Sequence, residues 1–345
     1  MGKKTVFVLV GAPASGKSQW VTQRGVDEYT KVVSADEYRL GMFGPLAEGN
    51  LKENQAELYA RVHKDIEDAV TDEGIQTIYY DATNTSRRRR RALYRNIKRW
   101  SKETAEVHIV YFSVPRAELL RRNATREGDE KVPEAVIYRM YETMQVPRAK
   151  VDCDTFSVQG VPMFDSNAFL EGSVGTGKEE LSRLLAHSSE DAREELKGVY
   201  SPHDCAPHHM ESIDEHIAMC IDTAKAPEYN NSGIKIIALF HDLGKAITKK
   251  TVETDGEPFS TFRGHADVSA NYFLNFIAYL DDGDYIYRQS YRDLMEIIRN
   301  HMHFHNGVGE KNIRNNRLNG DVLEIGKLFA HVDNVSRIRG TERKR

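Results

Sequence analysis

The chain has 345 residues, of which 29% are charged and 40% are hydrophobic, and its formal net charge is −4 at pH 7. This length is enough for two domains and exceeds what one ordinary core needs. No apolar run approaches the roughly 20 residues of a membrane helix, and the short apolar stretch near Met1 lacks a signal-peptide cleavage site. These features argue against an integral membrane protein and favour a soluble, globular one.

Charge and histidine are unevenly distributed. Residues 1–150 contain 26 Lys and Arg against 21 Asp and Glu, a balance of +5, whereas the remainder contains 22 against 31, a balance of −9. Only His63 and His108 of the 13 histidines precede residue 150. The basic half suits a polyanionic partner, and the acidic, histidine-rich half suits a metal. The three cysteines form no CxxC pair, which fits free thiols in a reducing cytoplasm.

The first 150 residues alternate between strand and helix patterns. Residues 5–10, 77–83 and 107–114 form short apolar runs typical of buried strands, and residues 51–70 carry apolar side chains at helical spacing. This alternation predicts an α/β domain, a parallel sheet with flanking helices. It gives the first predicted domain, residues 1–150.

The rest of the chain reads differently. Residues 151–204 look like a connector, because part of this segment is rich in Gly, Ser and Asn, and a helix is expected over 178–200. From residue 205 to residue 345 one helical pattern follows another with almost no strand signal. We therefore expect an all-α second domain over 205–345.

A phosphate-binding loop follows the first predicted strand. The string GAPASGKS over residues 11–18 fits GxxxxGK[ST] through Gly11, Gly16, Lys17 and Ser18. Its glycines let backbone N–H groups surround a phosphate, its lysine neutralises charge on the terminal phosphates, and its serine offers a hydroxyl to Mg²⁺. A second string, GSVGTGKE over 172–179, follows no strand and places Glu179 where Ser or Thr is needed, so we do not expect it to bind phosphate.

Polar residues after later strands are candidates for binding the phosphate acceptor. Asp36 could accept a proton from an attacking hydroxyl, and Arg39 could bind a substrate phosphate. Asp81 stands at a predicted strand end, before a turn and a helix capped by Ser86. Arginines in the basic segment 119–133 could fold over a nucleotide.

These segments together resemble the bacteriophage-type polynucleotide 5′-kinases. The resemblance spans residues 1–147 and rests on GAPASGKSQW, SADEYR, YDATNTSRRRR and FSVPRAELLRRNATREGDEKVPEAVIYRMYETM. It implies ATP and Mg²⁺ as cofactors and a phosphate acceptor that is a nucleic acid. The residues that it implies are Asp36 as general base, Lys17 and Ser18 for ATP·Mg²⁺, Arg122 and Arg126 in a lid over the phosphates, Arg39 on the acceptor's 3′ phosphate, and Asp81 at a polar position that we assign to substrate binding.

An unbroken arginine run, Arg87–Arg91, lies on the predicted helix after Asp81. Five consecutive positions cover every face of a helix, so these side chains cannot all contact one ligand. We expect most of them to be solvated, with some near a nucleic-acid path.

Histidines and aspartates recur on successive predicted helices after residue 205. The strings that contain them are IDEHIAMCI, LFHDLGKA, FRGHADVSANYF, IIRNHMHFHNG and KLFAHVDNVSR, and the residues are His216, His241, Asp242, His265, His301 and Asp333. One buried histidine is usually an ordinary core residue, but a set this large favours metal ligation. Imidazole with carboxylate suits Mn, Fe, Co, Ni, Zn or Mg without distinguishing them.

This pattern resembles the HD phosphohydrolase superfamily over about residues 205–340. The resemblance implies that His216, His241, Asp242 and Asp333 bind one metal and that His265 and His301 complete a second site bridged by Asp242. It also implies that Lys245 steadies a phosphate. We expect His208, His209, His303 and His305 to be surface or outer residues, and Asp321 is an alternative to Asp333.

The two halves together predict an enzyme that heals nucleic-acid ends, RNA more than DNA. A kinase would phosphorylate a 5′-OH through Asp36, Lys17 and Arg126, and a hydrolase centred on Asp242 would remove a 2′,3′-cyclic phosphate or 3′-phosphate. No KxDG nucleotidyl-transfer motif is present, so a separate RNA ligase would seal the ends. We expect this in the cytoplasm of a bacterium or phage-infected cell. The alternatives are a small-metabolite or nucleoside kinase fused to an HD nucleotidase, and a nucleic-acid-binding kinase whose HD module only senses metal.

Overall fold

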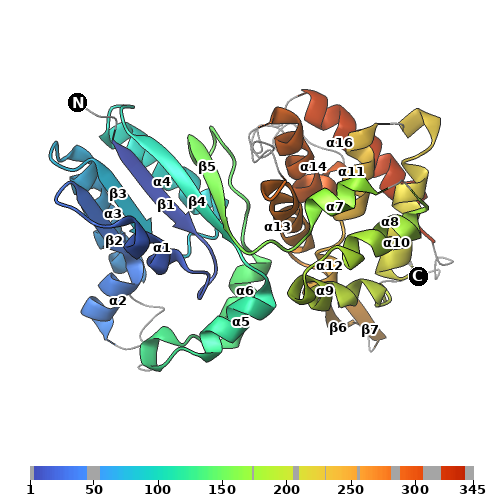
Figure 1. Cartoon of the computed structure of the whole chain (residues 1–345), viewed down its shortest axis with the longest axis horizontal. Helices are drawn as coiled ribbons and strands as arrows, with labels where there is room; N and C mark the ends of the chain where they lie inside the picture. Colours follow the sequence, from blue (N-terminus) through green and yellow to red (C-terminus); the bar gives the residue numbers. More distant parts are fainter. Residues whose placement is uncertain are drawn as a thin grey trace. The chain divides into compact units, whose positions relative to one another are not determined.

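The computed structural model of the chain contains two compact units, Met1–Val161 and Pro162–Arg345. The residues that it describes are 4–44, 55–172, 175–204, 210–229, 231–254, 257–280, 288–305 and 320–338. The first unit is an α/β domain and the second is largely helical (Figure 1). Both fold classes agree with the sequence prediction.

A five-stranded parallel sheet forms the centre of the first unit, in the order β2-β3-β1-β4-β5. The strands are β1 (Thr5–Val10), β2 (Thr30–Ser34), β3 (Thr77–Asp81), β4 (Glu106–Ser113) and β5 (Thr155–Gly160). The helices are α1 (Lys17–Arg24), α2 (Ala35–Phe43), α3 (Gln55–Thr71), α4 (Arg87–Trp100), α5 (Arg116–Ala124) and α6 (Glu134–Glu142). Because all strands are parallel, their carboxyl ends meet at one edge of the sheet, where ligands of such folds bind.

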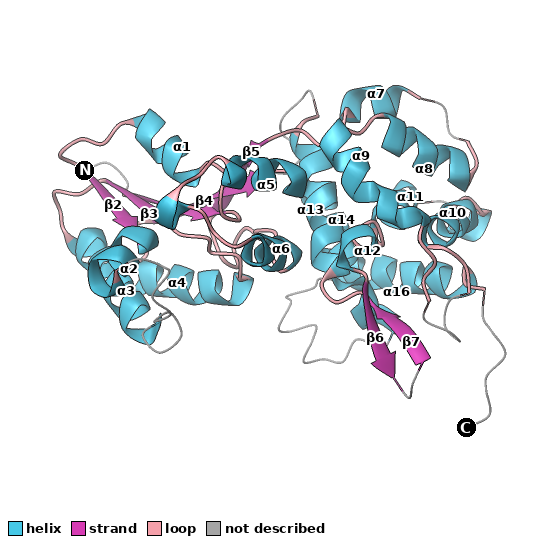
Figure 2. Ribbon diagram, turned by 90° about the horizontal axis from the view of Figure 1, so that it is seen from below, coloured by secondary structure: helices cyan, strands magenta, loops and turns pink. Residues whose placement is uncertain are grey.

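Helices cover both faces of this sheet, with α1 on one side and α3 and α4 on the other (Figure 2). On the α1 side, Leu9 and Phe112 belong to a buried cluster against which Trp20 of α1 packs. Alternate residues of β1, such as Val6 and Val8, are also buried, because successive side chains of a strand point to opposite faces. Burial on both faces explains why these strands read as continuous apolar runs.

Residues 151–204 are folded parts of both units instead of a connector. β5 adds to the sheet beside β4, and its Gly160 approaches so closely that an added Cβ would lie 2.0 Å from the Ser113 carbonyl oxygen. After Val161 come α7 (Ser166–Glu171), α8 (Gly177–Ala186) and α9 (Glu190–Leu196). The helix predicted over 178–200 is interrupted because Ser189 caps the start of α9 by accepting a hydrogen bond from Ala192 N.

The described part of the second unit is a bundle of helices with a hairpin. Besides α7–α9, its helices are α10 (Ile213–Thr223), α11 (Ser232–Phe240), α12 (Lys245–Thr248), α13 (His265–Ala278), α14 (Gln289–His305) and α16 (Gly320–Val335). The hairpin of β6 (Lys250–Thr254) and β7 (Glu257–Thr261) is antiparallel and was not predicted from the sequence. Among the described helices, none combines the length and apolar character that crossing a membrane requires.

Candidate active sites

The loop between β1 and α1 has the geometry that the GxxxxGK[ST] pattern predicts. Gly16 immediately precedes α1 with φ 96°, a left-handed conformation that favours glycine. Lys17 is buried, and its Nζ donates to the carbonyl oxygens of Gly11 and Ala12 at 3.0 and 2.9 Å. Burial lowers the pKa of Lys17 to about 8, partly opposed by Asp81. The loop and the first turn of α1 thus offer backbone N–H groups and one ammonium to a phosphate chain.

Asp81 at the end of β3 lies beside the loop, where β1 and β3 are neighbours. Ser18 Oγ donates a hydrogen bond to Asp81 Oδ2 at 2.6 Å. The turn after β3 is also joined to the strand that precedes the loop, because Asn84 Nδ2 donates a hydrogen bond to the Leu9 carbonyl oxygen at 2.9 Å. The partner of Asp81 is therefore the serine that would ligate Mg²⁺. This position fits a role on the metal side of the nucleotide better than the substrate contact predicted from sequence.

Asp36 and Arg39 lie one strand further, on the first turns of α2. Ser34 caps this helix by accepting from Glu37 N at 3.3 Å. The Asp36 side chain is 93% exposed, whereas that of Arg39 is 11% exposed, and Arg39 Nε lies 4.0 Å from Asp36 Oδ1. An exposed carboxylate beside an oriented guanidinium at the sheet's carboxyl edge could meet a substrate hydroxyl and phosphate.

Arg122 and Arg126 extend from α5 and the turn after it. Arg122 Nη1 lies 3.5 Å from the Ser15 carbonyl oxygen, directly against the loop, while its Nε binds Glu118 at 2.7 Å. Arg126 Nη1 donates to the Glu130 carbonyl oxygen at 3.2 Å, and its charge contributes to lowering the Lys17 pKa. Both cations therefore lie within electrostatic range of the phosphate site.

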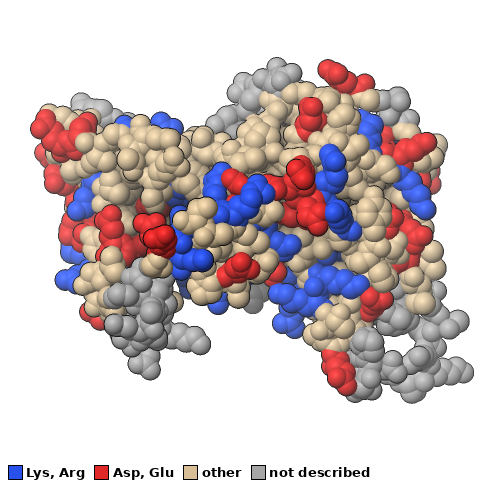
Figure 3. Space-filling view, turned by 60° about the horizontal axis from the view of Figure 1, so that its bottom comes forward, with Lys and Arg blue, Asp and Glu red and all other residues tan. Residues whose placement is uncertain are grey.

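Two arginines of the run on α4 serve the fold. Arg90 is buried and pairs with Asp152 at 2.8 Å, and Arg87 is buried with its Nη2 on the Val146 carbonyl oxygen at 2.7 Å. Arg88 and Arg89 are exposed. The expectation that most of the run is solvated is thus only half right. On the face of the first unit drawn in Figure 3, basic and acidic side chains are interspersed.

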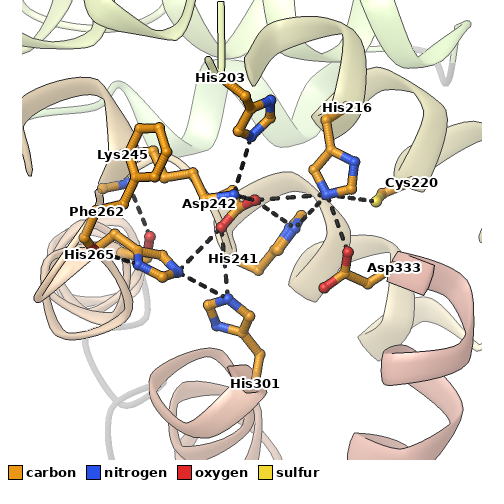
Figure 4. Close-up of polar contacts among 12 residues, drawn as sticks. His203, His216, Cys220, His241, Asp242, Lys245, Phe262, His265, His301 and Asp333 are labelled. Carbon is orange, nitrogen blue, oxygen red and sulfur yellow. Dashed lines mark hydrogen bonds and ion pairs between the residues drawn. The ribbon is translucent and has the colours of Figure 1, made fainter. Parts of the chain in front are cut away.

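The second unit brings all six predicted metal-ligating side chains to one buried place (Figure 4). They come from five separate positions in the bundle: His216 from α10, His241 and Asp242 from the end of α11, His265 from the start of α13, His301 from α14, and Asp333 from α16. Close packing explains the glycine in HDLGK, since a Cβ on Gly244 would lie 2.1 Å from the His265 carbonyl oxygen. The helical bundle thus converts scattered sequence positions into one cluster.

Each imidazole of the cluster is held by its Nδ1 against a backbone carbonyl oxygen. The distances are 3.0 Å for His216, 2.9 Å for His241, 2.7 Å for His265 and 2.7 Å for His301. A carbonyl oxygen can only accept, so Nδ1 carries a proton, and Nε2 of each ring points into the cluster. His265 Nε2 and His301 Nε2 face one another at 3.1 Å. Ring nitrogens that converge in this way can hold a cation between them.

Asp242 stands between the two halves of the cluster. Its Oδ2 lies 3.3 Å from His241 Nε2 and 3.6 Å from His216 Nε2, and its Oδ1 lies 3.4 and 3.5 Å from His265 and His301. Oδ1 is buried and accepts no well-formed hydrogen bond from the described residues. The pKa of Asp242 is held well below its usual value, because His241 and Lys245 outweigh the effect of burial. The residues therefore fit two cations that share this carboxylate.

Asp333 completes the first half, and three contacts hold it. Its Oδ1 lies 3.1 Å from His216 Nε2 and 2.9 Å from Arg337 Nη2, and its Oδ2 lies 2.5 Å from His305 Nε2. His305, expected to be a surface or outer residue, contacts Asp333 from outside the group of candidate ligands. Asp321, the predicted alternative, is exposed at the start of α16.

Lys245 and Glu211 contact members of the cluster, Asp242 and His216 respectively. Lys245 Nζ lies 2.7 Å from Asp242 Oδ2 and 3.0 Å from His203 Nε2. Glu211 is buried with Oε1 3.4 Å from His216 Nδ1. Burial opposes charge on His216, but Cys220, Asp333 and Glu211 outweigh it and hold the pKa of His216 well above its usual value. Burial lowers the pKa of His265 to about 3, which suits a neutral ligand.

Sequence reasoning missed several members of this centre: His203, Glu211, Cys220 and Arg337. Two of them carried a signal. Cys220 follows His216 by four positions on α10, so the two lie on the same helical face, and Arg337 follows Asp333 by four, just beyond the end of α16. His208 and His209 lie outside the described residues.

Comparison with known proteins agrees with this division. Residues 6–147 match the family model of the AAA domain, and residues 208–337 match that of the HD domain. No curated protein matches the chain significantly.

Solved structures that are similar to this chain include the following three, each with a low TM-score. "Structure of Pnkp1/Rnl/Hen1 complex" gives TM-score 0.29 with 25% identity over 35% of this chain and 40% of that one. "Structure of the Pnkp1/Rnl/Hen1 RNA repair complex" gives 0.33 with 24% identity over 43% and 50%. "Crystal Structure of Fungal RNA Kinase" gives 0.33 with 16% identity over 52% and 81%.

Proposed function

From a chain that joins an AAA-type P-loop domain to an HD domain, we propose a bifunctional enzyme that heals nucleic-acid ends. The first unit phosphorylates a 5′-OH with ATP, and the second removes a 2′,3′-cyclic phosphate or a 3′-phosphate. The observation that carries the proposal is the coexistence of a phosphate-binding loop and a buried histidine–aspartate cluster in one polypeptide. The two reactions together yield the 5′-phosphate and 3′-OH that a separate RNA ligase would join.

In the first unit, Asp36 takes the proton of the acceptor hydroxyl as its oxygen attacks the γ-phosphorus. The bond from the γ-phosphorus to the bridging oxygen breaks, and ADP leaves. Lys17, Arg122 and Arg126 neutralise charge on the transferring group, which is the main contribution proteins make to phosphoryl transfer. Mg²⁺ on the nucleotide would be held by Ser18 with Asp81 beside it. Arg39 binds a phosphate of the acceptor, which favours an oligonucleotide over a free nucleoside.

In the second unit, the first ion would be held by His216, His241, Asp242 and Asp333, and the second by Asp242, His265 and His301. Such ions supply Lewis acidity to the phosphoryl group and make water more acidic. Asp242 contributes to both halves of the cluster, because its Oδ2 lies near His241 and its Oδ1 lies near His265. Lys245, 2.7 Å from Asp242, steadies the negative charge of the phosphate. The specific feature that fits this function is the convergence of four Nε2 atoms on rings that are held in place through Nδ1.

A paired assay tests the kinase half. The protein, ATP and Mg²⁺ are incubated with a 5′-OH RNA oligonucleotide, its DNA counterpart and free nucleosides, and phosphate transfer is measured. Asp36→Asn should abolish transfer to the oligonucleotide, while Glu37→Gln, an exposed neighbour on the same helix turn, should leave it nearly unchanged. Transfer to nucleosides alone would refute the end-healing proposal in favour of a small-molecule kinase.

A second assay tests the hydrolase half. An oligonucleotide ending in a 2′,3′-cyclic phosphate or a 3′-phosphate is supplied with Mn²⁺ or Ni²⁺, and the product termini are identified. Asp242→Asn should remove this activity but leave 5′ phosphorylation intact, and the exposed Asp321→Asn should change neither. Metal bound without any end processing would instead support a sensing module.

A further inference from the structure

Cys220 lies inside the first half of the metal cluster. It is fully buried on α10, one helical turn after His216, and its Sγ lies 3.6 Å from His216 Nε2. Its Sγ, the Nε2 atoms of His216 and His241, and an oxygen of Asp333 all lie within 4.8 Å of one another. Figure 4 shows the thiol directed at the imidazole, beside the Asp333 carboxylate. The HD ligand pattern itself contains no cysteine.

The separations are those expected of ligands around one ion. Sulfur at ~2.3 Å and nitrogen at ~2.0 Å from a tetrahedral cation lie roughly 3.5 Å apart, and two such nitrogens lie roughly 3.3 Å apart. The observed values are 3.6 Å from Cys220 Sγ to His216 Nε2 and 3.4 Å from His216 Nε2 to His241 Nε2. Two of the three separations therefore match ligands of one ion, and the third pair, Cys220 and His241, lies within 4.8 Å.

The chemical identity of this donor matters. Thiolate is a soft ligand that favours Zn²⁺, Co²⁺ or Fe²⁺, whereas carboxylate and water suit Mg²⁺ and Mn²⁺. In the second half, Asp242, His265 and His301 form the group, and that group contains no sulfur. The two halves of the centre thus offer ions different chemistry.

We propose that Cys220 Sγ is a ligand of the ion held by His216, His241 and Asp333, so that this half selects a soft divalent ion over Mg²⁺. Cys220 binds as the thiolate, and its proton passes to solvent as the ion enters. This inference rests on the proposed function, because it takes the cluster to be a metal centre. It adds a residue and a metal preference that the histidine–aspartate set alone does not provide.

The test is the absorption spectrum of the Co²⁺-loaded full chain. Thiolate ligation of Co²⁺ produces a charge-transfer band in the near ultraviolet that nitrogen and oxygen ligands do not produce. The chain has three cysteines, so the double variant Cys153→Ala/Cys205→Ala retains Cys220 alone. This variant should keep the band, and Cys220→Ser should lose it. Elemental analysis of dialysed protein measures the Co²⁺ bound in each case.

Affinities give a second readout. Loss of even an outer partner of a metal ligand costs about 10–100-fold in affinity, so Cys220→Ser should weaken Zn²⁺ and Co²⁺ binding by at least about tenfold. Mn²⁺ binding should weaken less, because manganese gains little from sulfur. Circular dichroism checks that each variant is folded. If Cys220→Ser does not fold, the spectrum of the double variant still decides.

The outcomes separate this inference from the proposed function. Stoichiometric Co²⁺ without the band in the double variant would overturn the role of Cys220 and leave the metal centre in place. If the wild type binds no more Co²⁺ than His241→Ala does, the metal centre itself is overturned, and the inference with it. A band that is present in the double variant and absent from Cys220→Ser supports the proposal.

Discussion

Replacing Arg90 by alanine should destabilise the first unit severely, although Arg90 belongs to a run that looks like a nucleic-acid contact. Arg90 Nε and Nη2 both lie 2.8 Å from Asp152 Oδ2, and the two side chains are 1% and 0% exposed. Arg90 also donates to the carbonyl oxygens of Asn84, Thr85 and Gln145 at 2.8 to 3.0 Å. The substitution would leave a carboxylate and several carbonyl groups buried without their partner.

Breaking a buried ion pair by removing one member costs about 3–5 kcal/mol, because the remaining charge is uncompensated. Arg88→Ala, at an exposed position of the same run, should change the unfolding free energy by no more than about 0.5 kcal/mol. The double variant Arg90→Ala/Asp152→Ala should cost less than the sum of its single variants, by about 0.5–3 kcal/mol, since it leaves no unpaired charge.

Tryptophan fluorescence during urea unfolding is the assay, because both tryptophans, Trp20 and Trp100, lie in the first unit. The signal therefore reports on this unit within the full chain. A cost for Arg90→Ala within about 1 kcal/mol of the Arg88→Ala value would contradict the structural role, since paired buried charges cost several times more. Weaker oligonucleotide binding at unchanged stability would assign Arg90 to the nucleic-acid path instead.

Three further predictions concern ligand binding. ATP binds the protonated form of Lys17, whose pKa burial lowers to about 8, so affinity should be constant below pH 8 and fall by up to about tenfold per pH unit above it. Calorimetry between pH 7 and 9.5 measures this, and Lys17→Arg should give a flat profile. Asp81→Asn, which alters the partner of Ser18, should raise the Mg²⁺ concentration needed for half-maximal phosphorylation by at least tenfold, and an unchanged requirement would remove Asp81 from the metal side. Lys245 competes with a metal ion for Asp242, and Lys245→Met removes this competitor. Mn²⁺ should therefore raise the melting temperature of the second unit more in the variant than in the wild type. An equal rise in both proteins would contradict the competition.

Local patterns were sufficient to predict most of the first unit. Buried parallel strands give unbroken apolar runs, so β1, β3 and β4 could be located from the sequence. β5 could not, because an edge strand needs few apolar residues, and TFSVQG resembles the loops around it. The hairpin β6–β7 was missed for a related reason, since Val252 is largely exposed and little apolar alternation marks the strands.

The six candidate metal ligands could be picked out from the sequence because four of them, His216, His265, His301 and Asp333, lie on helices whose spacing the sequence displays. The contacts that depend on distant partners could not. Arg90 and Asp152 are 62 positions apart, and nothing local distinguishes Arg90 from the exposed Arg88. The sequence places Cys220 on the same face of α10 as His216. It does not show that this face packs against α11 and α16, which bring the other candidate ligands to it.

The hairpin β6–β7 lies between Lys245 and His265, two residues of the buried centre. Its base is fixed by pairing of Lys250 with Thr261, and Ser260 N donates to the Asp204 carbonyl oxygen at 3.0 Å. Because the two ends of an antiparallel ribbon are neighbours, insertions or deletions beyond this base would leave the ligand positions undisturbed. The fold therefore provides a place where the chain length could change while the arrangement of the buried histidines and aspartates is kept.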